Sequence, residues 1–197
     1  MENYKKLIGS ITIITFSYAA SRLLGFFREI LLANWAGVSE ATDTLDLAFI
    51  IPDFLFYLSA GGYLAITLIP IMSEKKKSEL NNYFLSILYG MSLIFVIFSL
   101  ITYSFRFQFA ELLGVTSLDF FVEVFTPIIF SQVFFFVGAI LMSYQYFHDN
   151  FKYAAIAPVV YNSTIIFFGW INSSTPEGTI KGFAIGTLIG SVLGHFL

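Results

Sequence analysis

The sequence predicts an all-α integral membrane protein, a polytopic bundle of about six transmembrane helices. Two features of the sequence lead to this prediction. Of its 197 residues, 57% are hydrophobic and only 12% are charged, whereas a soluble domain is nearer half apolar and a quarter charged. Segments such as MSLIFVIFSLITY (91–103) are apolar on every side, whereas transmembrane strands alternate polar and apolar residues. So much apolar surface needs lipid around it, and helices are expected to cross that lipid.

Composition also excludes several classes of function. The chain has no cysteine and two histidines without the spacing of metal ligands, so neither a disulfide framework nor a zinc site is expected. A net charge of −3 argues against nucleic-acid binding. No catalytic Ser/His/Asp set and no phosphate-binding glycine loop followed by lysine is present. We therefore expect a protein that is not an enzyme and uses no cofactor or metal.

A helix needs about 20 residues to cross the hydrocarbon core, and tilted helices run longer. The first apolar segment continues to Trp35 and stops at Gly37, with no cleavage site after a short apolar core, so it is interpreted as a retained helix. Ser39 or Thr42 is a plausible cap for the second. The last is still apolar at Leu197, so we expect the front part of a longer protein. The six expected helices form a single lobe, 1–197, and cover about 6–35, 43–72, 80–105, 118–146, 153–171 and 182–197.

Glycine spacing marks the last of these helices. The segment GFAIGTLIGSVLG has a glycine at every fourth position, namely Gly182, Gly186, Gly190 and Gly194. Small residues on one face of a membrane helix let a neighbouring backbone approach closely. The stripe therefore predicts close helix packing.

Orientation follows from the basic residues of the loops. Those expected on one side are Lys5, Lys6, Lys75, Lys76, Lys77 and Lys152, and those on the other are Arg106 and Lys181. This imbalance predicts a cytoplasmic N-terminus.

Charged residues inside the first helix are the clearest functional signal. Arg22 and Glu29 are seven residues apart, which places them about 20° apart on a helix, and Arg28 lies some 120° from Arg22. Gly25 falls between the arginines and would let a helix or a ligand come close. An arginine at mid-bilayer costs roughly 2.5–3.5 kcal/mol and usually faces a bundle interior or a water-filled cavity. These charges predict a polar cavity, although a purely structural Arg–Glu pair would explain Arg22 with Glu29.

The second helix carries acids. Asp43, Asp46 and Asp53 fall within an arc of about 80°, although Asp43 could be only a first-turn residue favoured by the helix dipole. Pro52 removes a backbone donor and is expected to kink the helix, and Gly61-Gly62 is a second weak point. An acidic bent helix opposite a helix with arginines indicates a transport pathway. In the fifth helix, Pro158, Tyr161 and Asn162 suggest a kink with a polar contact.

Two stretches carry a family resemblance. SRLLGFFREILLANWAGVSEATDTLDLAFIIPDFL (21–55) closely resembles the start of the MurJ/MviN family of bacterial lipid II flippases, within the multidrug/oligosaccharidyl-lipid/polysaccharide exporter superfamily. VGAILMSYQYFHDNFKYAAIAPVVYN (137–162) resembles the region of the fourth and fifth helices. The matching motif positions are Ser21, Arg22, Gly25, Phe26, Arg28, Glu29, Thr42-Asp43 and Ile51-Pro52-Asp53-Phe54. Glu29 replaces the usual Asp, and Phe56-Tyr57 stands where the family usually has Arg-Arg.

The resemblance implies two lobes with fourteen helices, of which this chain would be most of the first, in the bacterial cytoplasmic (inner) membrane. It implies alternating access around a cavity whose cationic residues hold a polyprenyl diphosphate. We expect flipping of a lipid-linked glycan precursor, lipid II or a relative, with membrane lipids and a coupling ion as further partners. The expected substrate-binding residues are Arg22, Arg28, Ser21 and Asn162, and the expected cavity or gating residues are Glu29, Asp43, Asp46, Asp53, Pro52 and Gly25.

Two other functions stay open on the sequence. The excess of acids over arginines would suit a cation-coupled exporter of the same superfamily. A non-transporting membrane scaffold or fragment that binds partners through the glycine stripe is the other alternative.

Overall fold

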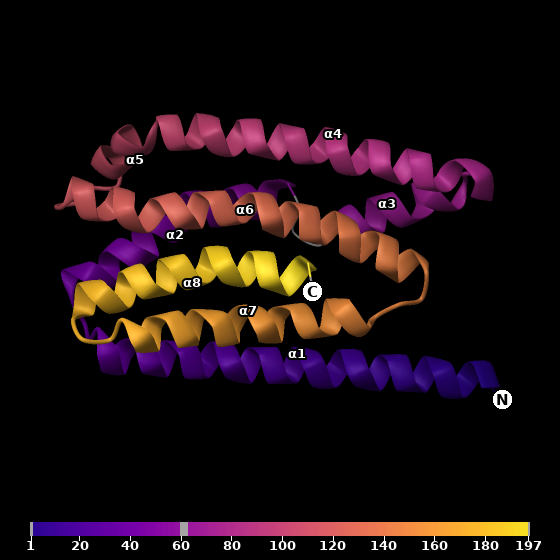
Figure 1. The fold of residues 1–197 in the computed structure, drawn as a ribbon, viewed down its shortest axis with the longest axis horizontal. Coiled ribbons are helices and arrows are strands. Elements are labelled where there is room, and N and C mark those ends of the chain that lie inside the picture. Colours follow the sequence, from indigo (N-terminus) through magenta and orange to yellow (C-terminus); the bar gives the residue numbers. More distant parts are fainter. Residues whose placement is uncertain (1, 60–62, 197) are drawn as a thin grey trace.

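The computed structural model describes residues 2–59 and 63–196, and this part of the chain is a bundle of eight helices (Figure 1). They are α1 (Glu2–Trp35), α2 (Glu40–Ser59), α3 (Tyr63–Ser73), α4 (Lys77–Ser104), α5 (Arg106–Leu112), α6 (Leu118–Phe147), α7 (Lys152–Ile171) and α8 (Pro176–Phe196). The long helices run side by side along the longest axis of the molecule.

The helix boundaries differ from the expected ones at two places. Within 43–72, where a single helix was expected, α2 runs to Ser59 and α3 from Tyr63, and the residues between them, which include Gly61-Gly62, lie outside the described residues. The short helix α5 was not predicted. The last helix begins at Pro176 rather than near Gly182, because Thr175 caps it: the Gly178 amide donates to Thr175 Oγ1 at 3.0 Å.

Three of the described helices, α4, α6 and α8, are long and apolar enough to cross a membrane, with mean hydropathies of 2.4, 2.2 and 1.2 over their best windows. The apolar part of α7, Ala155–Ile171, is shorter. Six spans were expected from the sequence. In α2 the acidic side chains lower the apolar character, since Glu40, Asp43, Asp46 and Asp53 fall within its 20 residues.

Helix α6 is the centre of the packing. It contacts α2, α3, α4, α5 and α8, and Figure 1 shows it between α4 and α8. Phe121, Phe125 and Ile128 are fully buried on it. An apolar helix surrounded by partners on most sides is expected to be buried in this way.

The glycine stripe of α8 packs against the backbone of α7, as predicted. A Cβ atom on Gly186 would lie 2.7 Å from Ile165 Cα, and one on Gly194 would lie 2.8 Å from the Ala157 carbonyl oxygen. A Cβ atom on Gly190 would lie 3.0 Å from the Tyr161 carbonyl oxygen. Only hydrogen fits in these spaces, so the stripe sets the separation of the two helices.

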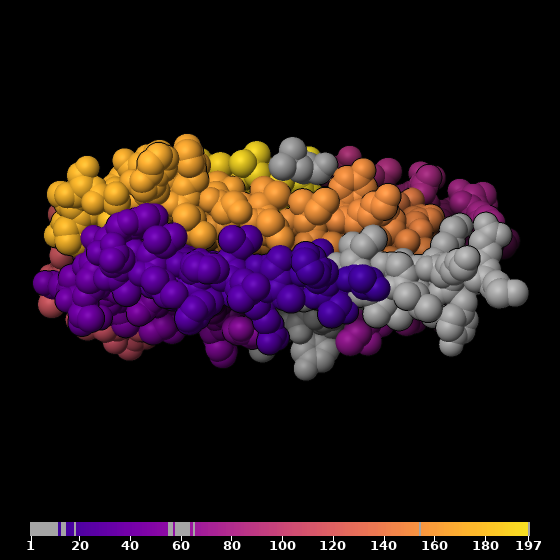
Figure 2. Space-filling view, turned by 90° about the horizontal axis from the view of Figure 1, so that it is seen from below, coloured from indigo at the N-terminus to yellow at the C-terminus, as the bar shows by residue number. Residues whose placement is uncertain are grey.

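Helix α1 lies on the outside of the bundle. It packs along α7, and Figure 2 shows it running along one long face of the molecule with its outer side uncovered. It ends at Gly37, whose positive φ of 65° is readily adopted by glycine. Ser39 then caps α2, its Oγ accepting from the Thr42 amide at 3.3 Å. After this turn α1 packs on α7 and α8 while α2 packs on α6 and α8, so the two helices diverge.

Candidate functional site

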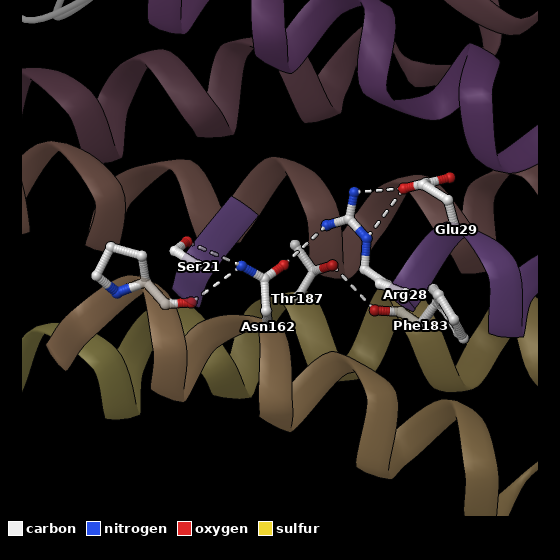
Figure 3. A network of polar contacts seen from close by, with 7 residues as sticks. Ser21, Arg28, Glu29, Asn162, Phe183 and Thr187 are labelled. Carbon is white, nitrogen blue, oxygen red and sulfur yellow. Dashed lines mark hydrogen bonds and ion pairs between the residues drawn. The ribbon is translucent and has the colours of Figure 1, made fainter. Parts of the chain in front are cut away.

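Arg28 is the centre of a polar network at the surface where α1 meets α7 (Figure 3). Its Nη2 and Nε donate to Glu29 Oε1 at 2.6 and 3.1 Å. Its Nη1 points to Asn162 Oδ1 at 3.5 Å. The Arg28 side chain is 28% exposed and that of Glu29 is 58% exposed. The guanidinium group is therefore held from two sides and still reaches open space.

Asn162 connects the two helices. Its side chain is buried, and its Nδ2 donates to the Pro158 carbonyl at 3.0 Å and to Ser21 Oγ at 3.4 Å. The result is that Ser21, Arg28 and Asn162, which the sequence assigned to substrate binding, lie in one network.

A cavity of about 390 Å³ opens beside this network. It is lined by Arg28 of α1, by Tyr161 of α7, and by Asp46, Phe49, Ile50 and Asp53 of α2. A smaller recess of about 60 Å³ lies next to it, with Arg28, Asp46 and Phe49 in common and Glu29 and Thr187 among its other lining residues. The cavity lies between α1 and α2, which diverge because they pack on different helices.

The charges around this cavity are mixed. The Arg28 guanidinium attracts the Asp53 carboxylate, whereas Glu29 and Asp43 repel that of Asp46. With one cation and two carboxylates on its wall, the cavity can hold an anionic group at Arg28 and accept hydrogen bonds elsewhere.

Arg22 and Asp43 lie apart from this cavity. Both are exposed, and neither lines one of the pockets formed by the described residues. Glu29 pairs with its neighbour Arg28, while no described residue bonds to the Arg22 side chain. A long arginine side chain can bend back to the next residue, so wheel angles alone do not decide pairing.

Gly25 and Pro52 are not among the residues that line this cavity. No described atom lies within 4 Å of the position of a Cβ on Gly25, so this glycine faces open space and no helix packs on it. Pro52 is buried, and α2 continues through it from Glu40 to Ser59.

The structure adds residues that the sequence did not assign to the site. Another recess, of about 190 Å³, is lined by Phe49, Asp53, Tyr57, Gln132, Phe135 and Tyr161. Gln132 could have been suspected, because it is an uncharged polar residue in the middle of the apolar helix α6. The aromatic residues give no such signal, since 25 phenylalanines and 11 tyrosines are spread through the chain. Among the described residues, no group of three or more His, Asp or Glu is placed to hold a metal ion.

This fold and this cavity define the class of the protein: it is a polytopic, all-helical integral membrane protein with a hydrophilic cavity between its helices. The family model described as "Lipid II flippase MurJ" matches residues 32–196. The chain therefore belongs to the MurJ family of lipid II flippases.

Individual relatives agree with this placement. The chain is 32% identical over 192 residues to the lipid II flippase MurJ of Thermosipho africanus, a match that covers 93% of this chain and 39% of that protein. A solved structure titled "Lipid II flippase MurJ, inward closed conformation" superposes with a TM-score of 0.78 at 29% identity, covering 94% of this chain and 40% of that one. The chain thus spans about two fifths of the length of these relatives. Its helices and these relatives indicate a protein of the bacterial inner membrane.

Proposed function

We propose that this chain is the N-terminal lobe of a transporter that flips a lipid-linked glycan precursor, lipid II or a related polyprenyl-diphosphate sugar, by alternating access. The observation that carries the proposal is Arg28, a cation near the C-terminal end of the long helix α1 that lines an open cavity of this membrane protein. Such a charge is costly in lipid and marks substrate pathways in membrane proteins. The names of the two relatives supply the substrate class.

In this proposal Arg28 contacts the diphosphate. Hydrogen bonds between a guanidinium group and phosphate oxygens are strong and often bidentate. Glu29 occupies two of the Arg28 donors and is more than half exposed. We expect the phosphate to displace Glu29 when it binds, so that Glu29 exchanges partners as the cavity opens and closes. Arg22, on the exposed side of α1, is the second proposed contact, and Ser21 and Asn162 position Arg28.

The remaining acidic residues are proposed to attract a coupling ion rather than to contact the diphosphate. Asp46 and Asp53 line the cavity, and Asp43 lies one turn before Asp46 on the same helix. A coupling ion, if the transporter uses one, would be attracted by this acidic side of the cavity.

We also propose that the N-terminus is cytoplasmic. Figure 1 places the N-terminal end of α1, the turn between α3 and α4, and the turn between α6 and α7 at the same end of the bundle. The last two of these carry Lys75, Lys76 and Lys152. Basic loops stay on the cytoplasmic side of membrane proteins.

The test is depletion of the protein in its own bacterium, followed by a leaflet-specific accessibility assay for lipid-linked precursors. Depletion is expected to trap the precursor in the inner leaflet, and plasmid copies carrying Arg28→Ala or Arg22→Ala are expected to restore little flipping. Arg106→Ala is the matched control, because Arg106 stacks on Tyr103 and Phe107, away from the cavity. All copies are compared at equal membrane abundance.

Two outcomes would contradict the proposal. Full flipping with both Arg22→Ala and Arg28→Ala would remove the head-group role of these residues. An unchanged precursor distribution after depletion, together with new sensitivity to cationic drugs, would favour the exporter alternative. The scaffold alternative has lost its proposed surface, since the glycine stripe is covered by α7.

A further inference from the structure

The recess of about 190 Å³ between α2, α6 and α7 has a composition unlike that of the cavity next to it. It shares Phe49, Asp53 and Tyr161 with the cavity that contains Arg28, and it adds Tyr57, Gln132 and Phe135. The recess and the cavity therefore adjoin, with these three shared residues at their boundary.

Two polar groups of the recess are hydrogen-bond acceptors that call for a donor. Gln132 is 5% exposed, and its Oε1 is buried without a hydrogen-bond partner among the described residues. The Asp53 carboxylate accepts hydrogen bonds only, as long as it is ionised. Leaving a buried acceptor unsatisfied costs about 1–3 kcal/mol. The recess is therefore suited to an occupant that donates hydrogen bonds.

The rest of the lining is aromatic. Phe49, Tyr57, Phe135 and Tyr161 contribute four rings from three helices. Aromatic rings offer flat apolar faces, and the tyrosines add a polar edge. A pyranose ring fits these demands, because its C–H faces stack on aromatic rings while its hydroxyl and amide groups donate at its edge. A hydrocarbon tail would leave the buried Gln132 oxygen unpaired, and an ionised phosphate oxygen has no hydrogen to donate to it.

We propose that this recess is a sugar subsite: it binds the pyranose ring attached to the diphosphate of the lipid-linked substrate. Asp53 and Gln132 accept hydrogen bonds from the sugar, and the aromatic rings stack on it, while Arg28 holds the adjacent phosphate. This inference rests on the proposed function, since it assumes a lipid-linked sugar diphosphate as substrate. It assigns the binding of the sugar and of the diphosphate to different residues.

The experiment separates these two parts of the ligand. The full-length protein, purified in detergent, is titrated with undecaprenyl diphosphate and with undecaprenyl diphosphate carrying one N-acetylhexosamine, and bound lipid is measured by native mass spectrometry. The sugar is expected to tighten binding to the wild-type protein by about tenfold, which corresponds to about 1.4 kcal/mol. Gln132→Met is expected to lose this gain and to bind the bare diphosphate as the wild type does. Asp53→Ala is also expected to lose the gain from the sugar, and only the ratio of its two affinities is compared, because Asp53 lines the Arg28 cavity as well.

Two further variants act as references. Arg28→Ala is expected to weaken the binding of both lipids by the same factor. Asp119→Ala, which removes an exposed acid in the first turn of α6 that lines none of the pockets described here, is expected to keep the full gain from the sugar. Gln132→Met keeps the volume of the side chain, so the test remains decisive even if Asp53→Ala fails to fold.

The outcomes distinguish the subsite from the function. If the sugar adds nothing to wild-type binding, or if Gln132→Met and Asp53→Ala weaken both lipids equally, the subsite is wrong while the proposed function stands. If neither lipid binds to the wild-type protein, the proposed function fails together with the subsite.

Discussion

Substitution of Gly186 by alanine tests whether the α7–α8 contact holds the lobe together. The added Cβ would lie 2.7 Å from Ile165 Cα and 3.1 Å from the Thr164 carbonyl oxygen. Non-bonded carbon atoms are most favourable at about 3.5–4.0 Å, so α7 would have to move away by roughly 1 Å. Both neighbours are backbone atoms, and a backbone cannot turn aside as a flexible side chain can.

The size of the effect follows from two opposing contributions. Overpacking a tight contact typically destabilises by about 1–3 kcal/mol, whereas alanine is favoured over glycine in a helix by about 1 kcal/mol. We expect Gly186→Ala to lower the free energy of unfolding by up to about 2 kcal/mol, and by about 1–3 kcal/mol relative to an alanine substitution that makes no such contact. Gly90→Ala is the matched control, because no described atom lies within 4 Å of its Cβ position on α4. That variant is expected to be unchanged or up to about 1 kcal/mol more stable.

The assay is reversible unfolding of the purified protein in mixed micelles with increasing dodecyl sulfate, followed by circular dichroism. A Gly186→Ala protein as stable as Gly90→Ala would refute the reasoning, since it would mean that α7 and α8 separate without loss. An equal loss in Gly90→Ala would refute it as well, because the effect would then come from the loss of glycine and not from the contact.

Two further predictions follow from single side chains. Arg28→Lys keeps the charge but lacks the planar fork through which Arg28 donates twice to Glu29 and points a third donor at Asn162. We expect flipping to fall about tenfold or more at equal abundance, and wild-type flipping would show that charge alone suffices. Ser39→Ala removes the cap of α2 and is expected to lower the free energy of unfolding by about 1 kcal/mol in the same assay. Ser39→Asp keeps a capping oxygen and should retain wild-type stability. Equal stability of the two variants would mean that the cap contributes nothing.

Much of the architecture was predictable because it is local. Helices in a membrane satisfy their own backbone hydrogen bonds, so apolar runs such as 91–103 predict helices without knowledge of their neighbours. The four-residue glycine spacing of α8 predicted the close contact in the same way, since small residues on one face have a direct packing consequence. The short helix α5 was missed because its seven residues are too few for a periodic pattern to stand out.

The site was less predictable. Ser21, Arg28 and Asn162 could be nominated from their residue types and the family resemblance, but Arg22 had an equal claim to Arg28 and lies outside the cavity. Gln132 gains its importance only from what surrounds it, namely a buried oxygen without a partner and the aromatic rings of two other helices.

The sequence by itself determined that this chain is helical, that it resides in a membrane and that some of its apolar helices carry charged residues. These properties depend on residue type and on spacing within one helix. Only the tertiary structure decided which charges share a space. Arg28 meets Asp46 and Asp53 because α1 packs on α7 while α2 packs on α6 and α8. That divergence depends on how several helices rotate and cross relative to one another, so it cannot be predicted from the sequence of any single helix.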